Sequence, residues 1–130
     1  MASSPFGTFN GVEPFAIFPG VGLHPIAGDQ VFLGHVVYEA GTTVKRHSHE
    51  HTEQAMLVLE GSVTMTIGDQ TKELGPGDVC VVNRGVEHEL HSAIGVTFVE
   101  ALGPVPLDHI PDRGRDLVLG DLEGSLHVDK

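Results

Sequence analysis

Residues 41–54 read GTTVKRHSHEHTEQ and place histidines at positions 47, 49 and 51, just before a carboxylate and an amide. Side chains two residues apart on a β-strand point to the same face, so His47 and His49 can aim their imidazoles at one point. Glu53 or Gln54 can approach that point from the strand that follows. The pattern predicts a metal site, provided that a further ligand arrives from elsewhere in the chain. The competing interpretation is a solvated, histidine-rich turn.

The composition favours a single all-β domain. The 130 residues include 17 glycines and 8 prolines, and no long helical period is visible. Short strands joined by tight turns have this character. A formal charge of -11 argues against nucleic acid or an anionic membrane as a partner. One cysteine, Cys80, excludes an internal disulfide, and it lies in an apolar run that suits a buried packing thiol. Without a signal-like start or a long apolar run, we expect a cytoplasmic protein.

Runs of strand-forming residues separated by turn signals occupy the middle of the chain. They lie at residues 30–39, 43–47, 55–59, 62–67, 70–74, 79–82, 86–91 and 96–102. Strands at such short intervals predict a sandwich or a small barrel. We divide the single domain, residues 1–130, into an N-terminal arm (1–28), a barrel (29–103) and a tail (104–130). The tail is expected to form a brief strand pair or a lid over one end of the barrel.

The N-terminal arm carries four of the six phenylalanines. Pro14, Pro19 and Pro25 exclude a helix and leave an extended segment, with a short strand at 14–18. Its aromatic rings need apolar cover. The arm either packs on its own barrel or crosses to a second subunit, and we expect a homodimer.

A second stretch, residues 77–92, reads GDVCVVNRGVEHELHS. A turn at Gly85 places His88 at the start of a strand. His88 lies 39 residues beyond His49, so it can reach the same metal only if the sheet closes on itself.

Together the two stretches resemble the two sequence motifs of the cupin superfamily. The first motif reads Gly, five residues, His-x-His, three or four residues, Glu or Gln, six residues, Gly; the matching positions are Gly41, His47, His49, Gln54 and Gly61. The second reads Gly, five residues, Pro-x-Gly, two residues, His, three residues, Asn. Its matching positions are Gly77, Asn83, Gly85, His88 and Ser92, with Asn83 in place of Pro and Ser92 in place of Asn. The resemblance covers residues 30–103 and implies a small double-stranded β-barrel, a jelly roll, with one metal in its mouth.

The resemblance also implies the metal ligands, which are His47, His49, Gln54 and His88. Glu53 would replace Gln54 only if the spacing were three residues. Strand parity favours Gln54, because it lies on the same face as Met56 and Val58. His51 continues the alternate pattern past the strand end and is expected at the rim. Such a ligand set accepts zinc, nickel, copper, iron or manganese, and it leaves the 2+ charge uncompensated.

Glu100 is the candidate base. If it points inward it shares a face with Phe98 and Leu102, where a carboxylate is costly unless it is paired, protonated or near a cation. The alternative places Glu100 on the outer face with Thr97 inside. A weaker expectation is that the pocket wall consists of Tyr38, Met56, Phe98 and Leu102. His35 is a further weak candidate for lining the site, and alternation places it on the same face as Val31, Leu33 and Val37.

Three functions compete. The first is a non-redox metalloenzyme for an isomerisation, cyclisation or lyase step on a small oxygen-rich substrate. Small cupins with such sites include proteins that rearrange unsaturated uronates, and related ones resemble cyclases of aromatic polyketides. The uronate group has Phe and Arg where this chain has Leu102 and Pro106. The second is an Fe(II) dioxygenase, which more often keeps a carboxylate at the position of Gln54. The third is a non-enzymatic sensor of sugars or metabolites.

Overall fold

The structure is a computed structural model that describes residues 5–105, with the side chains of residues 17 and 18 excepted. The described part is all β. Its strands are β1 (Phe15–Phe18), β2 (Val21–Ala27), β3 (Phe32–Tyr38), β4 (Thr42–His47), β5 (Glu53–Gly61), β6 (Val63–Ile67), β7 (Gln70–Leu74), β8 (Val79–Val82), β9 (His88–Ser92) and β10 (Val96–Gly103). Among these residues there is no helix long and apolar enough to cross a membrane.

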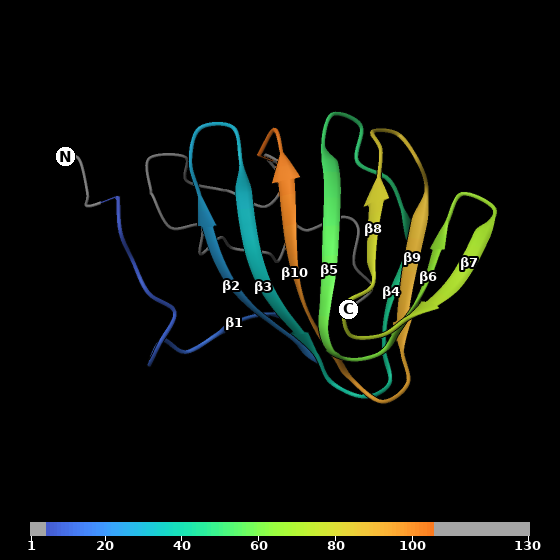
Figure 1. Cartoon of the computed structure of the whole chain (residues 1–130), viewed down its shortest axis with the longest axis horizontal. Coiled ribbons are helices and arrows are strands. Elements are labelled where there is room, and N and C mark those ends of the chain that lie inside the picture. The colour runs from blue at the N-terminus through green and yellow to red at the C-terminus, as the bar shows by residue number, and fades with distance from the viewer. Residues whose placement is uncertain (1–4, 106–130) are drawn as a thin grey trace.

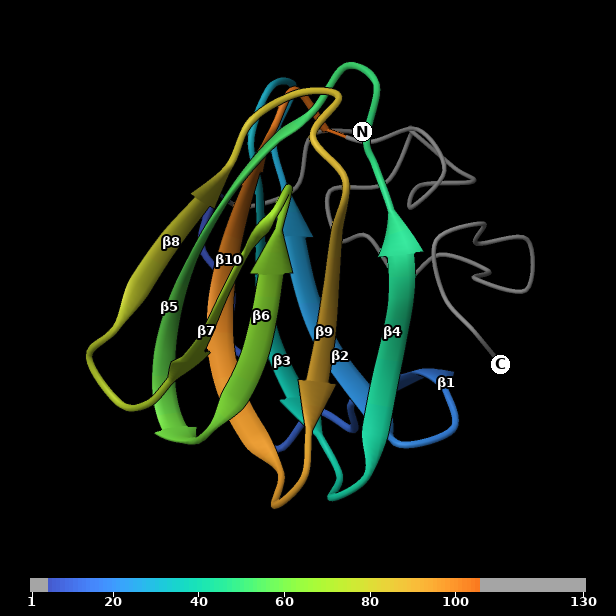
Figure 2. The same ribbon diagram turned by 90° about the vertical axis from the view of Figure 1, so that its right-hand side faces the viewer.

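The strands form two antiparallel sheets. The six-stranded sheet has the order β1-β2-β3-β10-β5-β8, and the four-stranded sheet has the order β4-β9-β6-β7. Figure 1 shows the six-stranded sheet spread from β1 to β8, and Figure 2 shows the four-stranded sheet facing the viewer. The predicted fold class, a small jelly-roll barrel, is confirmed. The tail from residue 106 onward lies outside the described residues.

The strand predicted at residues 14–18 is present as β1, but the sequence did not predict β2 within the arm. Pro25 argued against a strand there, since proline cannot donate to a β-ladder. β1 pairs only with residues 21–23 of β2, so the part of β2 that contains Pro25 borders an open edge. Proline is tolerated at such an edge. The arm therefore adds a β1–β2 hairpin to the sheet of its own chain.

The two sheets enclose one hydrophobic core. Alternate residues of each strand point inward, which is the usual consequence of strand geometry. The inward side chains include the whole predicted pocket wall, and all of them are buried: Leu23, Phe32, Val36, Tyr38, Val44, Met56, Val58, Val63, Met65, Leu74, Val82, Leu90, Val96, Phe98 and Leu102.

Gly61, which closes the first motif, lies where β5 passes the turn between β9 and β10. Its φ is 75°, a left-handed conformation that favours glycine. A Cβ at this position would also collide with the carbonyl oxygen of Gly95. The glycine is thus required by close backbone packing as well as by its conformation.

Candidate metal centre

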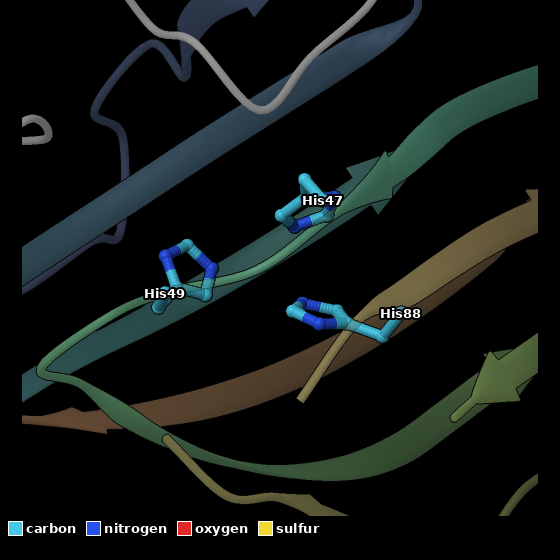
Figure 3. A group of neighbouring side chains, drawn as sticks. All are labelled: His47, His49 and His88. Carbon is cyan, nitrogen blue, oxygen red and sulfur yellow. The ribbon is translucent and has the colours of Figure 1, made fainter. Parts of the chain in front are cut away.

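Three histidines from the two motifs meet at one end of the barrel. One imidazole nitrogen from each of His47, His49 and His88 can be chosen so that all three lie within 4.8 Å of one another. Figure 3 shows the three rings gathered in one place, from β4, the loop after it and β9. The ring centroids of His47 and His88 are 4.1 Å apart. This spacing suits three nitrogen ligands of a single divalent ion.

Backbone hydrogen bonds set the tautomers of two of these rings. His47 Nδ1 lies 2.6 Å from the carbonyl oxygen of Lys45, and His88 Nδ1 lies 3.0 Å from that of Val86. A carbonyl oxygen only accepts, so Nδ1 is the protonated nitrogen in both rings. The lone pair of each neutral ring is then on Nε2, which is the arrangement that metal-binding histidines commonly show.

His88 provides the test of whether the site fits a metal. Its side chain is fully buried, and its Nε2 has no hydrogen-bond partner. A buried polar atom left unsatisfied is costly, and few occur in folded proteins. Burial also lowers the pKa of His88 and outweighs the opposing effect of the Val86 hydrogen bond, while the charge of Arg46 lowers the pKa a little further. His88 is therefore a neutral imidazole whose lone pair lacks a partner, as a metal ligand should be.

A β-bulge turns His47 toward the interior. Val44 pairs with Leu90 and His47 pairs with His88, so three steps along β4 match two steps along β9. The extra residue reverses the alternation, because without it His47 would point away from the face of Val44. The sequence argument from alternate positions did not detect this bulge.

Arg46 holds the bulge from outside. Its Nε donates to Glu87 Oε1 at 2.8 Å, its Nη1 to Glu89 Oε1 at 3.5 Å, and its Nη2 to the carbonyl oxygen of Gly68 at 2.9 Å. These contacts, led by the hydrogen bond to Glu87, raise the pKa of Arg46. One guanidinium thus connects β4, the β6–β7 turn and the segment that leads to His88.

His49 lies beyond the end of β4, in the loop that leads to β5. The amide of Gly85 donates to the carbonyl oxygen of His49 at 2.8 Å. Gly85 belongs to the second motif and His49 to the first. This bond ties the loop that carries His49 to the β8–β9 loop that leads to His88, although the two loops are far apart in the sequence.

Gln54 and Glu53 lie on opposite faces of β5, as strand parity predicts. Gln54 is buried on the inner face of β5 with Met56, and Glu53 is exposed on the other face. Gln54 Nε2 donates to Glu100 Oε1 at 2.8 Å. Glu100 therefore lies inward, on the face of β10 that also carries Phe98 and Leu102. The two polar side chains are paired inside an otherwise apolar sheet face.

Gly34 provides the space for Glu100. The two residues are partners across β3 and β10, and a Cβ at position 34 would come within 3.4 Å of Glu100 Cγ. The same Cβ would be 2.9 Å from Phe32 Cε1. Because position 34 is glycine, no side chain of β3 occupies the space that the Glu100 side chain fills.

Tyr38 and Phe98 form part of the buried wall around this pair. Their rings pack edge to face, with centroids 5.3 Å apart. Burial raises the pKa of Tyr38, and the charge of Glu100 raises it further. Tyr38 is consequently a neutral phenol and cannot act as a base near neutral pH.

Two other candidate residues lie outside the cluster. His51 is exposed beside Glu50, consistent with a position at the rim. His35 is on the outer face of β3, where its ring packs against His24 with centroids 6.2 Å apart. The expectation that His35 lines the site was wrong, because Phe32, Val36 and Tyr38 occupy the inner face of that strand.

Ser92 has a structural role that the sequence did not reveal. It is fully buried, its Oγ donates to the carbonyl oxygen of Ser62 at 2.7 Å, and it accepts from the amide of Gly95 at 2.9 Å. A hydroxyl here closes the turn between β9 and β10, so Ser92 supports the strand that carries His88.

A groove of about 590 Å³ runs between the edge strands β7 and β8 and contains none of the three histidines. Ile67, which lines it, is the cross-strand partner of His88. Cys80 also lines the groove and is half-buried, and burial raises the pKa of its thiol. Cys80 is therefore a protonated thiol, but it is half-buried at the groove and not fully buried as the sequence suggested.

Comparisons with known proteins agree with this architecture. Residues 34–97 match the Cupin_2 family model, described as a cupin domain. The fold and this sequence match together support assignment of the chain to the cupin superfamily. Among solved structures, an RmlC-like cupin from Shewanella frigidimarina superposes with a TM-score of 0.76 at 21% identity, covering 83% of this chain and 97% of that one. KdgF from a Halomonas species gives 0.74 at 18% identity, covering 79% and 96%.

One sequence relative is the tetracenomycin polyketide synthase protein TcmJ of Streptomyces glaucescens. It is 25% identical over 83 residues. The match covers 64% of this chain and 56% of the relative. The chain thus spans little more than half the length of that protein.

Proposed function

We propose that this cupin is a mononuclear metalloenzyme that catalyses a non-redox isomerisation, cyclisation or lyase step on a small oxygen-rich substrate. The observation that carries the proposal is Glu100, a carboxylate turned into the barrel and hydrogen-bonded to Gln54 at 2.8 Å. His47, His49 and His88 would hold the metal, with the amide oxygen of Gln54 as a fourth ligand. A divalent cation held there would supply positive charge that acidifies a substrate bound through oxygen.

The chain itself supplies the proton transfer. Glu100 is the inward carboxylate next to the predicted ligand Gln54, so its Oε atoms are the acceptors for a proton removed from the substrate. The Gln54 hydrogen bond fixes the orientation of that carboxylate. The apolar side chains of Phe98 and Leu102, which are buried on the same face, limit the access of water to this carboxylate.

The nature of residue 54 supports a non-redox role. An amide can donate to Glu100 through nitrogen and still offer its oxygen to a metal, whereas a carboxylate at position 54 would meet Glu100 with like charge. The polyketide synthase relative is consistent with a cyclisation on a polyketide-like substrate, and a sugar acid is the other substrate class that the site would suit.

The decisive experiment is elemental analysis of protein purified without an affinity tag. We expect one zinc, nickel, copper, iron or manganese ion per chain in the wild type. Gln54→Ala should lose most of it, and the matched variant Glu53→Ala should keep it, since Glu53 is the exposed neighbour. Retention by Gln54→Ala together with loss by Glu53→Ala would refute the ligand assignment.

A second measurement separates this function from an Fe(II) dioxygenase. The metal-loaded protein should consume no oxygen with candidate phenols or flavonols. It should catalyse exchange of an acidic substrate proton with deuterium from solvent, and Glu100→Gln should abolish this exchange while retaining metal. Oxygen uptake in proportion to substrate would contradict the non-redox assignment.

A further inference from the structure

The barrel is open on the side where β7 and β8 lie. β7 is the last strand of the four-stranded sheet and β8 is the last strand of the six-stranded sheet, so the two do not pair with each other. They are joined only by the turn at residues 75–78, which can be followed in Figure 2. The groove of about 590 Å³ lies between these two edges. Its volume is within the range of small-molecule pockets, about 300–1,000 Å³.

The floor of this groove is apolar. It consists of inward-facing side chains from both sheets, namely Met65, Ile67, Leu74 and Cys80. Met65 and Leu74 are buried in the core, and Ile67 and Cys80 pack against it while remaining partly exposed. An apolar ligand on this groove floor would remove its own surface and that of the floor from water, which favours binding.

Two polar side chains of β7 stand over the groove floor. Lys72 is the cross-strand partner of Met65, and Gln70 is the cross-strand partner of Ile67. Partners in an antiparallel pair share a face of the sheet, so Lys72 and Gln70 occupy inward positions. Both are nevertheless exposed, because β7 is an edge strand and the groove opens beside it. Positions that alternation assigns to the interior thus carry an ammonium group and an amide.

Lys72 has no acidic partner within the described part of the chain, where the salt bridges involve other residues. Asp78 also lines the groove, but its Oδ2 accepts from the amide of Gly75 at 2.9 Å and is held in the turn. The ammonium of Lys72 and the side-chain amide of Gln70 therefore present N–H donors over an apolar floor. Such donors complement a carboxylate.

We propose that the groove binds a small amphipathic carboxylate. The apolar body of this ligand lies on the groove floor, and its carboxylate accepts hydrogen bonds from Lys72 and Gln70. A mostly apolar pocket with a few polar groups that fix the orientation is the usual form of a small-molecule site. The groove contains none of the three clustered histidines, so this site goes beyond the proposed reaction and requires no metal.

The test uses octanoate and 1-octanol as probes, with binding to the full-length protein measured by isothermal titration. Lys72→Gln should weaken octanoate binding about fivefold and leave 1-octanol binding unchanged, since an exposed ion pair contributes modestly. Arg84→Gln is the matched control, because Arg84 lies in the β8–β9 loop outside the groove, and it should change neither affinity. Cys80→Phe fills the groove and should abolish binding of both probes, with circular dichroism of each variant as the check on folding.

Cys80 locates the bound probe, because it is the single cysteine of the chain and lines the groove. Its alkylation by iodoacetamide at alkaline pH should slow as octanoate saturates the protein. Octanoate should still bind to His49→Ala, which lacks one of the clustered histidines. Octanoate binding that is lost in His49→Ala and unaffected by Lys72→Gln would mean that the carboxylate binds at the histidine cluster, and the proposal would be overturned.

Two further outcomes would overturn the proposal. Inward charges also protect edge strands from pairing with other chains. If Lys72→Gln promoted self-association in sedimentation experiments and left octanoate affinity unchanged, Lys72 would only guard the edge of β7. If Cys80 resisted alkylation in the ligand-free protein even at alkaline pH, the groove would already be filled by another segment of the chain or by a second copy.

Discussion

The two sheets enclose the same interior but contribute different groups to it. The four-stranded sheet carries His47 and His88, whose ring orientation is fixed by hydrogen bonds to backbone carbonyl groups. The six-stranded sheet carries Gln54 and Glu100, which are fixed by each other. One sheet therefore presents imidazole lone pairs, and the other presents a hydrogen-bonded amide and carboxylate; in the function proposed above, the first would hold a cation and the second would move a proton. Placing these groups on separate sheets lets each be oriented without disturbing the other.

The largest effect is expected from His88→Ala, which removes the buried ligand of the four-stranded sheet. Metal affinity should fall by at least about a hundredfold, since even partners of the ligands contribute tenfold or more. Isothermal titration with zinc, supported by elemental analysis, measures the change. His91→Ala, on the outer face of the same strand, is the control. An equal loss of metal affinity in the two variants would contradict the assignment of His88 as a metal ligand.

The polar pair of the six-stranded sheet is tested by Gln54→Glu in metal-free protein. Two carboxylates at hydrogen-bond distance should raise the pKa of one of them above the value of about 4.3 for an unfolded Glu. The folded state then binds more protons than the unfolded state, so stability should fall as the pH rises above about 4.3. We expect a loss of roughly 1–3 kcal/mol at pH 8.

The double variant Gln54→Glu/Glu100→Gln restores one amide and one carboxylate with the positions exchanged. It should recover most of that stability, as measured by urea unfolding at pH 5 and pH 8. If the single variant were as stable as the wild type at pH 8, the two side chains would not be coupled as the structure has them.

A smaller effect is expected from Gly34→Ala on the six-stranded sheet. The new Cβ would be 2.9 Å from Phe32 Cε1 and 3.1 Å from Leu23 Cδ1, so these side chains must shift. Overpacking of this kind should cost about 1–2 kcal/mol, which thermal unfolding would detect. Gly28→Ala has no atom within 4 Å of its Cβ and should not destabilise the protein. Equal melting temperatures for the two variants would show that position 34 is not crowded.

The smallest effect is expected from Arg46→Ala, which removes the outer support of the bulge on the four-stranded sheet. The side chain is 40% exposed, so its ion pairs are screened by solvent. Metal affinity should fall by less than about tenfold, and the difference from wild type should shrink in high salt. Arg84→Ala, an exposed arginine in the β8–β9 loop, provides the comparison. An effect as large as that of His88→Ala would mean that Arg46 does more than hold the bulge.

The sequence by itself determined the strands from residue 30 onward, the two motifs with their histidines and the inward position of Gln54, whereas it left open whether Glu100 points inward. Hydrophobic alternation is a local property, and on β5 the two faces differ enough for it to separate Gln54 from Glu53, whereas on β10 it left two orientations of Glu100 open. On β3 it failed for His35, because that strand is apolar on both faces: Phe32 and Val36 point inward while Leu33 and Val37 point outward. A strand that contacts apolar surroundings on both sides gives no sign of which side is the interior.

Tertiary structure alone decided the features that depend on pairing between distant segments. The bulge in β4 exists only relative to β9, and it determines that His47 faces inward. Pro25 is accommodated in β2 because, among residues 5–105, no strand pairs with β2 beyond residue 23 on its outer side. The Gln54–Glu100 bond likewise joins residues 46 positions apart in the sequence. Residue spacing encodes which side chains can share a face, but the distances between faces are set only when the sheets close.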